Sequence, residues 1–327
     1  MGRLVMRVYN TVSCSVTGYR KQLTHSPCED AIKVVHLHKG TIIAVADGHG
    51  DARCSFASIG AKLATYAACS VLGRYLKGAP RQLSKYWNSR RNQIAAEIWQ
   101  NFALRVVEDY RVQINSKLSD EMASMLRERI KSYFCLSDEV LTSDAMREKY
   151  TKQQMIDKTL ERILFLYGTT IRASVLTETY LFNCALGDGD TIALIDDRVE
   201  WLLPQTQPFG TETASLCEPA EDVVDSFLFS YVSCVADALQ DGPYEEGSVF
   251  VPTVILATDG LRNSFFSEAG FKEKVKELSD EAHSLKKPLR QGRLKRLCGK
   301  LSRESVFQDD VSTVIATRAE GLRNYRY

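Results

Sequence analysis

The chain has 327 residues, of which 44% are hydrophobic and 25% are charged. That composition is typical of a globular protein, and the length allows one large domain or two small ones. The 42 basic and 41 acidic residues nearly cancel, so the net charge of +1 provides no overall attraction to nucleic acid or to a membrane surface. The nine cysteines are scattered singly, which is typical of reduced intracellular thiols and not of a disulfide framework or a zinc site.

The N-terminal segment, MGRLVMRVYNTVSCSV, is too short in its apolar part and too interrupted by arginine for a signal peptide. No apolar run approaches the roughly 20 residues that a membrane span needs. We therefore expect a cytoplasmic protein with no membrane partner.

The first part of the chain predicts strands followed by a helix. Residues 4–10 (LVMRVYN) and 31–35 (AIKVV) are short β-prone runs, and HKG at 38–40 predicts a turn. The apolar run TIIAVAD at 41–47 predicts a strand that is buried on both faces. A helix is expected after Asp51, because apolar residues then recur at helical spacing: Phe56, Ile59, Leu63 and Tyr66.

Residues from about 80 to 160 predict a helical insertion. Two apolar series step by four residues: Ile94, Ile98, Phe102, Val106 and Tyr110, and then Met122, Leu126, Ile130 and Phe134. Such stripes are typical of amphipathic helices that pack in a core.

Strands resume at residue 169. One hairpin is expected to turn near Thr177 and Glu178, and a second near Asp196 and Asp197. VPTVILATDG and DDVSTVIATR predict two further strands, separated by a helical segment at about 266–303. This order of elements predicts an α+β fold, and because no Pro/Gly-rich linker divides it, we expect a single domain over residues 1–327.

The stretch 286–303 carries eight Lys or Arg residues and no acid. Leu294, Leu297 and Leu301 share one helical face there, which predicts a helix packed by its leucines with a solvated basic face. The alternative is a docking surface for acidic or phosphorylated partners. We do not expect nucleic acid, because no aromatic residues interleave with the basic ones.

Acidic residues stand at four places where a predicted strand meets a loop. Asp47, Asp188 and Asp259 end strands and are each followed by glycine, while Asp309 and Asp310 precede the last strand. Asp-Gly is a common turn pair, so each could be an ordinary turn. If the strand ends converge, however, the carboxylates repel unless a cation lies between them, and carboxylates suit Mg²⁺ or Mn²⁺.

The ordered set of segments resembles the PPM family of type 2C metal-dependent protein Ser/Thr phosphatases, and its bacterial branch in particular. The matching segments are PCEDA at 27–31, AVADGHGDA at 44–52, GTT at 168–170, LFNCALGDGDTIALI at 181–195, ILATDGL at 255–261 and DDVSTVI at 309–315. The resemblance implies two antiparallel β-sheets packed as a central sandwich, flanked by helices. It further implies two Mn²⁺ or Mg²⁺ ions in a cleft at one end of the sandwich.

The resemblance assigns most of the acids to these ions. Asp47 would bridge both, the Gly48 carbonyl would hold the second, and Asp259 and Asp309 would be direct ligands. The remaining assignments are Glu29 and Asp30 as holders of metal-bound waters, Asp188 at a third, weaker metal site, and Asp310 as an alternative to Asp309. Asn263 stands where many relatives have an aspartate, which weakens a third site. Asp190 is expected to be a surplus carboxylate in a turn.

The implied reaction is attack on phosphorus by a water or hydroxide that bridges the two metals, which needs no covalent enzyme intermediate. His49 would protonate the leaving alkoxide, although it could simply be a hydrogen-bonded loop residue. Arg20 is the nearest match to the arginine that grips phosphate in many relatives. The segment between Gly18 and Glu29 is longer than usual, so Arg20 and Lys21 could equally be surface charges, and His25 is another polar candidate.

These residues predict a phosphatase acting on phosphoserine or phosphothreonine in proteins, with a cognate Ser/Thr kinase as a further partner. Two alternatives remain open. One is a pseudophosphatase that binds phosphoproteins without turnover, and the other is a metal-dependent nuclease or nucleotide phosphohydrolase.

Overall fold

The computed structural model describes residues 8–79, 84–114, 118–133, 143–195, 198–204, 213–234, 249–284 and 287–319. Its strands form two five-stranded sheets in which all named neighbours are antiparallel. Sheet A has the order β1 (Tyr9–Val16), β10 (Val311–Arg318), β9 (Thr253–Ala257), β6 (Asp190–Ile195) and β7 (Arg198–Trp201). Sheet B has the order β2 (Ala31–Leu37), β3 (Gly40–Ala46), β4 (Ile171–Leu176), β5 (Tyr180–Leu186) and β8 (Leu228–Ser233). The expected α+β sandwich of two antiparallel sheets is confirmed.

The apolar run 41–47 belongs to a strand that is buried on both faces, as predicted. Because side chains alternate along a strand, Ile43 and Val45 face the other sheet and join the core between the two sheets. Ile42 and Ala44 face the opposite way, into the core beneath the helices. This double burial explains why β3 lacks the alternation of polar and apolar residues seen in half-exposed strands.

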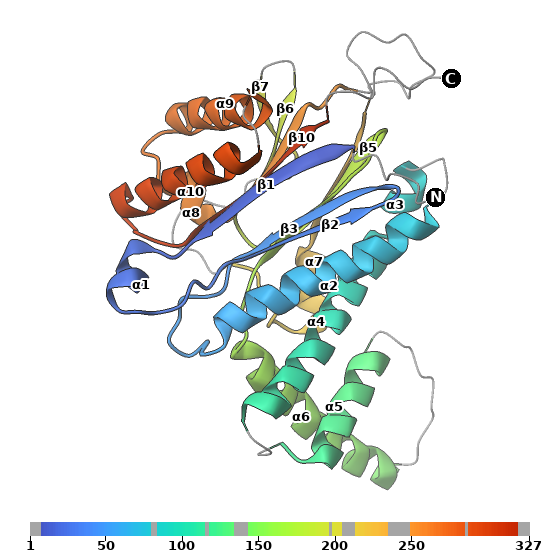
Figure 1. Ribbon diagram of the computed structural model, residues 1–327. Helices are drawn as coiled ribbons and strands as arrows, with labels where there is room; N and C mark the ends of the chain where they lie inside the picture. The colour runs from blue at the N-terminus through green and yellow to red at the C-terminus, as the bar shows by residue number, and fades with distance from the viewer. Residues whose placement is uncertain are drawn as a thin grey trace, which may run out of the picture.

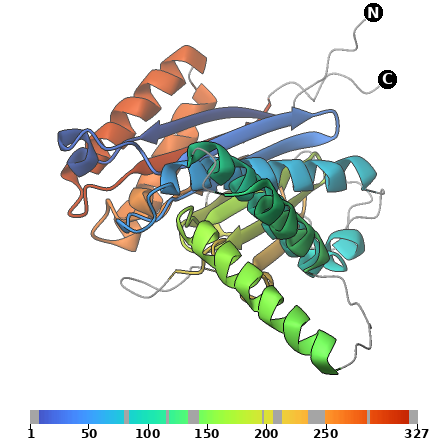
Figure 2. The same ribbon diagram turned by 90° about the horizontal axis from the view of Figure 1, so that it is seen from below.

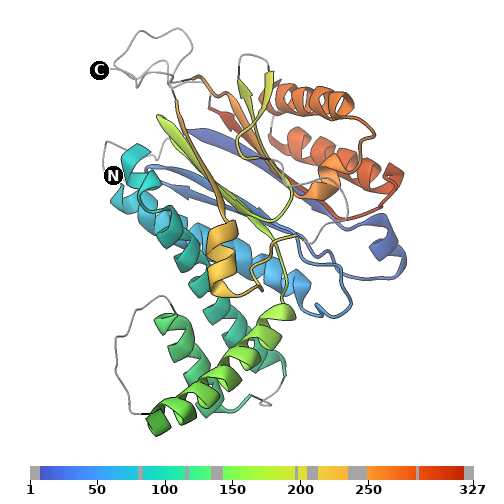
Figure 3. The same cartoon turned by 180° about the vertical axis from the view of Figure 1, so that it is seen from behind.

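Helices cover the outer face of each sheet. Over sheet B lies α2 (Ala57–Gly78), which contacts β2, β3 and β4. Over sheet A lie α9 (Glu268–Ser284) and α10 (Lys287–Glu304), which contact β1, β7 and β10. Figures 1 and 3 show these two groups on opposite sides of the sandwich. The short helices are α1 (Tyr19–Leu23), α3 (Ser84–Asn88), α7 (Ala220–Ser226) and α8 (Asp259–Arg262).

The buried face of α2 differs from the predicted one. Phe56, Ile59 and Leu63 are only partly buried and Tyr66 is 49% exposed, whereas five alanines of the helix are buried: Ala57, Ala61, Ala64, Ala67 and Ala68. Small side chains let the helix axis approach the sheet closely. The larger residues therefore lie along the sides of the contact.

Helices occupy the region of the predicted helical insertion: α4 (Arg91–Gln113), α5 (Asp120–Ser132) and α6 (Ser143–Phe165), in addition to α3. Its predicted stripes are buried at Ile94, Ile98, Phe102, Val106, Leu126 and Ile130, while Phe134 lies outside the described residues. Figures 1 and 2 show α5 and α6 projecting away from the two sheets. The insertion forms a lobe at one end of α2.

Two expected turns frame sheet B. The turn at HKG joins β2 to β3, and the hairpin of β4 and β5 turns at residues 177–179. The other predicted turn pair, Asp196 and Asp197, lies outside the described residues, but β6 and β7 do pair on either side of it. The predicted strand at 4–10 is partly wrong, because β1 begins at Tyr9 and continues to Val16, with residues 1–7 outside the described part.

The basic stretch 286–303 lies mainly in α10, with its leucines turned inward as expected. Leu294 and Leu301 are buried against sheet A, and Leu297 packs beside them. The helix thus behaves as a packed helix with basic residues on its outer side.

Candidate active site

The pairing of β2 with β3 brings two acids together at one end of sheet B. Ala46, the last residue of β3, lies opposite Ala31, the first residue of β2. Asp47 follows β3 and Asp30 precedes β2, so antiparallel pairing places the two carboxylates side by side. The main-chain oxygen of Asp47 accepts hydrogen bonds from the Thr170 N–H (2.8 Å) and the Thr169 hydroxyl (2.8 Å), which fix the position of the strand end.

Strand pairing in sheet A brings acids together in the same way. The Thr258 N–H, at the end of β9, donates to the Ser312 carbonyl in β10 at 3.0 Å. Asp259 follows Thr258 and begins α8, while Asp309 and Asp310 immediately precede β10. The antiparallel pairing of β9 with β10 therefore places Asp259 near Asp309 and Asp310, although the two segments are far apart in the chain.

Thr258 also joins the two sheets at this point. Its hydroxyl donates to Asp30 Oδ2 at 2.9 Å and accepts from the Ser312 N–H at 3.1 Å. Asp30 immediately precedes β2 of sheet B, and Ser312 lies in β10 of sheet A. The Thr258 side chain therefore links the acidic ends of the two sheets.

Two glycines permit the close approach of these segments. The Gly48 N–H donates to the Glu29 carbonyl at 3.1 Å, and a Cβ at Gly48 would lie 2.7 Å from that oxygen and 2.8 Å from the Ala57 carbonyl. At Gly260 a Cβ would lie 1.9 Å from the Asp310 carbonyl. The Asp-Gly pairs are thus required by backbone packing at the site, in addition to any role of Gly48 toward a ligand.

The pKa values of Asp47, Asp30 and Asp259 are raised because these carboxylates are buried near other carboxylates. Burial raises the pKa of Asp47 well above its usual value, and the charges of Asp30 and Asp259 raise it further. Burial, followed by the charge of Asp310, raises the pKa of Asp30 to about 7. Burial, followed by the charge of Asp188, raises the pKa of Asp259 to about 6. Neighbouring carboxylates in a partly dry site each disfavour ionisation of the others.

A hard divalent cation suits this set of donors. Oxygen ligands and concentrated negative charge are what Mg²⁺ and Mn²⁺ prefer, and Asp30 Oδ1 is buried without a hydrogen-bond partner. Within the described residues, however, no three His, Cys, Asp or Glu side chains lie close enough together to hold an ion as they stand. The residues fit a cation in their chemistry, and ligation would require small movements of the side chains.

Asp309 and Asp310 have different surroundings. Asp310 Oδ1 accepts from the Gly18 N–H at 2.6 Å, and Oδ2 accepts from the Glu29 N–H at 2.7 Å. Its side chain is only 2% exposed, whereas that of Asp309 is 48% exposed. Asp310 therefore fastens the segment 18–29 to the start of β10, and Asp309 is the more open of the two carboxylates.

Lys21 supplies a positive charge among these acids. Its Nζ lies 2.7 Å from Asp310 Oδ2, 2.6 Å from Glu29 Oε2 and 3.7 Å from Asp309 Oδ1. Burial alone would lower the pKa of Lys21, but its hydrogen bonds to Asp310 and Glu29 outweigh that effect, and the pKa is raised. Lys21 is therefore protonated at neutral pH.

The sequence prediction favoured Arg20 over Lys21. Both residues lie in α1, but Arg20 is on its exposed side, whereas Lys21 is half-buried against the acids. His25, the other candidate, is exposed and has a positive φ of 56°. Of the three, Lys21 is the cation that reaches the acidic residues.

His49 is held beside the acids by its backbone. Its N–H donates to the Gly168 carbonyl at 3.0 Å, just after the end of α6. Burial lowers the pKa of its imidazole, while the charges of Asp188 and Asp51 act in the opposite direction. The lowered pKa favours a neutral ring near pH 7, so a role in donating a proton would depend on those two carboxylates.

Asp188 lies in the turn between β5 and β6, near both His49 and Asp259. Its Oδ2 accepts from the Thr213 hydroxyl at 3.2 Å. Beneath the turn, the buried Arg172 donates from Nε to the Asp188 carbonyl at 2.9 Å and from a terminal nitrogen to the Gly187 carbonyl at 3.1 Å. Arg172 thereby fixes the backbone that carries Asp188.

The expectation that Asp190 is a surplus turn residue is wrong. Asp190 is completely buried as the first residue of β6, where it accepts from the Trp201 indole N–H at 3.0 Å. Its other oxygen lies 3.5 Å from Arg262 Nε in α8. A buried carboxylate needs such partners. Asp190 therefore links the start of β6 to α8, the helix that begins with Asp259.

A family model described as Protein phosphatase 2C matches residues 17–297. The chain belongs to the protein phosphatase 2C family. Among solved structures, a bacterial serine phosphatase aligns with a TM-score of 0.51 and 11% identity, covering 96% of this chain and 99% of its own. The photosystem II phosphatase PBCP aligns with a TM-score of 0.52 and 11% identity, covering 95% and 99%. At these identities the likeness shows the fold alone. A search of curated protein sequences finds no match.

Asn263 distinguishes this protein phosphatase 2C chain from the pattern that the sequence resemblance implied. Its side-chain amide donates to Asp259 Oδ2 at 2.8 Å. The interaction occupies one oxygen of Asp259 with a neutral donor, and the weak third cation site stays a prediction.

The chain also contains a residue spacing that is typical of a different class of phosphatase and that the sequence prediction did not consider. Cys14 and Arg20 have the Cys-x₅-Arg spacing of phosphatases that use a cysteine nucleophile. In this protein phosphatase 2C chain, however, Cys14 is buried in β1 against α10, while Arg20 lies on the exposed side of α1. The two residues do not form a phosphate-binding loop.

Sequence reasoning did not single out Thr258 and Arg172 of this protein phosphatase 2C site, and it did not predict that Asp190 is buried and paired. The available signal was weak, namely a polar residue within otherwise apolar strand runs such as IRASVL at 171–176.

Among the described residues, no helix combines the length and the apolar character needed to cross a membrane.

Proposed function

We propose that the chain is a metal-dependent protein serine/threonine phosphatase that hydrolyses phosphoserine or phosphothreonine in protein substrates. The observation that carries the proposal is the meeting of Asp30 and Asp47 from sheet B with Asp259 from sheet A at one end of the sandwich, where the charges of Asp30 and Asp259 both raise the pKa of Asp47. Family membership supports the reaction class.

The cations would be two Mn²⁺ or Mg²⁺ ions. Asp47, Asp259 and Asp309 are the proposed direct ligands together with the Gly48 carbonyl, and Glu29 and Asp30 would act through bound water. When present, the ions supply an activated water for attack and neutralise charge on the phosphoryl group. Asp188 is proposed for a third, weaker site. Asp310 is not proposed as a ligand, because both its oxygens are already bonded within the protein.

The other side chains would bind substrate and transfer protons. Lys21 is protonated and partly exposed among the acids, so we assign the phosphate-binding role to Lys21 in place of Arg20. Binding of a phosphate would require its ammonium group to turn from Glu29 toward the ligand. His49 would donate a proton to the leaving oxygen of Ser or Thr, with the charges of Asp188 and Asp51 favouring the protonated ring.

The test is hydrolysis of p-nitrophenyl phosphate and of phosphoserine peptides, with and without Mn²⁺. Asp47→Asn should reduce the rate by more than the roughly 100-fold that loss of a supporting group near a metal typically costs. The matched control is Asp280→Asn, which makes the same change at an exposed carboxylate of α9, away from the acids of the site. The control should stay close to wild type.

The main competing function is a pseudophosphatase. It predicts binding of phosphopeptides without turnover by the wild-type protein at saturating Mn²⁺. Turnover of DNA or nucleotides in preference to phosphopeptides would instead indicate a phosphohydrolase of another class. A cognate kinase and a cytoplasmic location are part of the same proposal, and both would be tested in the cell that produces the protein.

A further inference from the structure

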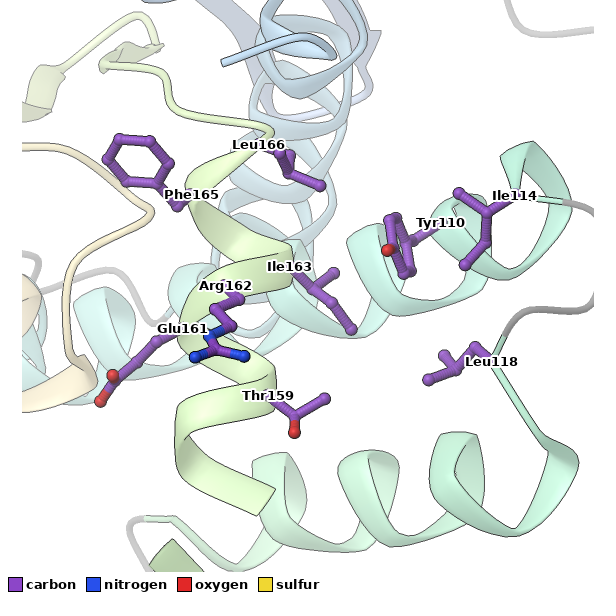
Figure 4. Close-up of a pocket in the computed structure, with 9 residues that line it drawn as sticks. All are labelled: Tyr110, Ile114, Leu118, Thr159, Glu161, Arg162, Ile163, Phe165 and Leu166. Atoms are coloured by element: carbon purple, nitrogen blue, oxygen red, sulfur yellow. The ribbon is translucent and has the colours of Figure 1, made fainter. Parts of the chain in front are cut away.

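The helical lobe contains a cavity of about 700 Å³ between α4, α6 and Leu118, which lies just before α5. Figure 4 shows its side chains. Its apolar lining consists of Tyr110, Ile114, Leu118, Ile163, Phe165 and Leu166. Three polar residues of α6 complete the lining, namely Thr159, Glu161 and Arg162. A cavity of this size and apolar character is typical of a binding site.

The cavity is directly connected to the loop that carries His49. The carbonyl of Leu166 accepts from the Phe56 N–H at 2.8 Å, and the carbonyl of Gly168 accepts from the His49 N–H at 3.0 Å. Gly168 is two positions after Leu166 in the chain, which is a distance of at most about 7 Å. One wall of the cavity therefore lies within about 10 Å of the His49 backbone.

Side chains as well as the backbone join the end of α6 to the loop that carries His49. The Arg53 guanidinium lies 5.3 Å from the centre of the Phe165 ring, and Arg53 itself pairs with Asp51 in the loop after His49. Phe165 is 38% exposed, and Figure 4 shows its ring on the side of α6 that carries Glu161, away from Tyr110 and Ile114. Arg53 and Phe165 therefore join the end of α6 to the loop that follows His49.

Arg162 gives the cavity a positive charge. Within the part of the chain that the structure describes, its exposed guanidinium has no ion-pair or hydrogen-bond partner. Glu161 does not neutralise it, because Figure 4 shows that carboxylate pointing away from the space enclosed by Tyr110, Ile114 and Ile163. The cavity thus combines an apolar interior with a cation that no described residue pairs.

We propose that this cavity is a substrate-recognition site, which rests on the proposed function and extends it. It accepts a large apolar side chain of the phosphoprotein, and Arg162 accepts an acidic side chain beside it. Because an extended peptide advances about 3.3 Å per residue, the apolar residue lies three to five residues from the phosphorylated one. The preferred substrate is therefore a phosphoserine or phosphothreonine segment followed or preceded at that distance by an apolar-acidic pair.

The experiment measures binding separately from turnover. Fluorescent peptides carry a non-hydrolysable phosphonate in place of phosphoserine, with Leu-Glu, Leu-Gln, Gly-Glu or Gly-Gln placed three, four or five residues to either side. Fluorescence anisotropy gives their affinities for the wild-type protein and its variants. We expect Leu to bind at least about ten-fold more tightly than Gly at one spacing, because burying a leucine is worth more than one ten-fold step.

Three variants locate the effect. Thr159→Trp fills the cavity and should abolish the preference for Leu, while Arg162→Glu should abolish or reverse the preference for Glu over Gln. The matched control is Lys158→Glu, which makes the same charge change on α6 at an exposed residue outside the cavity lining. It should leave both preferences in place.

Turnover of p-nitrophenyl phosphate by the same variants separates the two proposals. This substrate has no peptide chain, so its hydrolysis should match wild type in all three variants. If the wild-type protein does not discriminate among the peptides, or if Thr159→Trp and Arg162→Glu keep its preferences, the recognition site is refuted even when p-nitrophenyl phosphate is hydrolysed. If the preferences are present but nothing is hydrolysed, the recognition site is supported and the phosphatase proposal fails.

Discussion

The adjacent carboxylates of Asp309 and Asp310 should give opposite results when each is replaced by alanine. Asp310 accepts three hydrogen bonds, from the Gly18 N–H, the Glu29 N–H and the Lys21 ammonium, at 2.6 to 2.7 Å. Its replacement leaves these donors without their partner in a nearly dry site. Asp309 is half exposed, and its one short hydrogen bond is to the N–H of the next residue, at 2.7 Å.

The size of the effect follows from burial. Breaking a buried ion pair by removing one partner costs about 3–5 kcal/mol, so we expect Asp310→Ala to lower the free energy of unfolding by about 4 kcal/mol. With an unfolding entropy of about 2.1 cal/mol/K per residue, a chain of 327 residues loses about 6 °C in Tm. Asp309→Ala removes a largely exposed group and should cost no more than about 1 kcal/mol, or about 1–2 °C.

Thermal unfolding in EDTA and in a series of Mn²⁺ concentrations measures both effects. Asp309→Ala should unfold near the wild-type temperature in EDTA but gain less stability from Mn²⁺, since a ligand stabilises the folded state only in proportion to its occupancy. Asp310→Ala should be less stable in EDTA while retaining most of the gain from Mn²⁺. Equal losses in EDTA, or a full Mn²⁺ response in Asp309→Ala, would refute the division of roles.

Two further predictions concern the buried charges. Arg172→Met should lower the free energy of unfolding by about 3 kcal/mol, because it removes two hydrogen bonds to buried main-chain carbonyls and a charge that faces Asp190. Adding Asp190→Asn should recover part of the loss, so strictly additive losses in a thermodynamic cycle would contradict the coupling. In EDTA, the folded-state pKa values of Asp30 (about 7) and Asp259 (about 6) lie above the ordinary value near 4. The folded protein then binds more protons than the unfolded chain between about pH 4 and pH 7, so stability is full below pH 4 and falls as the pH rises through 6 to 7. One pKa unit corresponds to about 1.4 kcal/mol, so the loss should be on the order of 7 kcal/mol. Mn²⁺ should reduce it, and a Tm that stays constant from pH 5 to pH 8 in EDTA would be inconsistent with the pKa assignments.

Local patterns in the sequence determined the elements of the fold. The apolar run at 41–47 required a strand buried on both faces, the four-residue steps from Ile94 required a helix, and the Asp-Gly pairs marked the strand ends. These features depend on side-chain periodicity and on glycine, both of which are properties of short segments. The acids that meet at the end of the sandwich could be proposed for the same reason, because each lies at a strand end.

Tertiary structure alone decided which polar side chains serve the site and which hold it together. Arg20 and Lys21 are neighbours in sequence, as are Asp309 and Asp310, and no local pattern distinguishes the members of either pair. Their roles differ because the α1 helix turns Lys21 toward β10, and because the Gly18 and Glu29 amides, nearly three hundred residues away in the chain, converge on Asp310. The cavity beside His49 likewise exists only because the end of α6 is hydrogen-bonded to the loop after β3. Such long-range contacts depend on how the two sheets and the helical lobe pack, which a single segment of sequence does not specify.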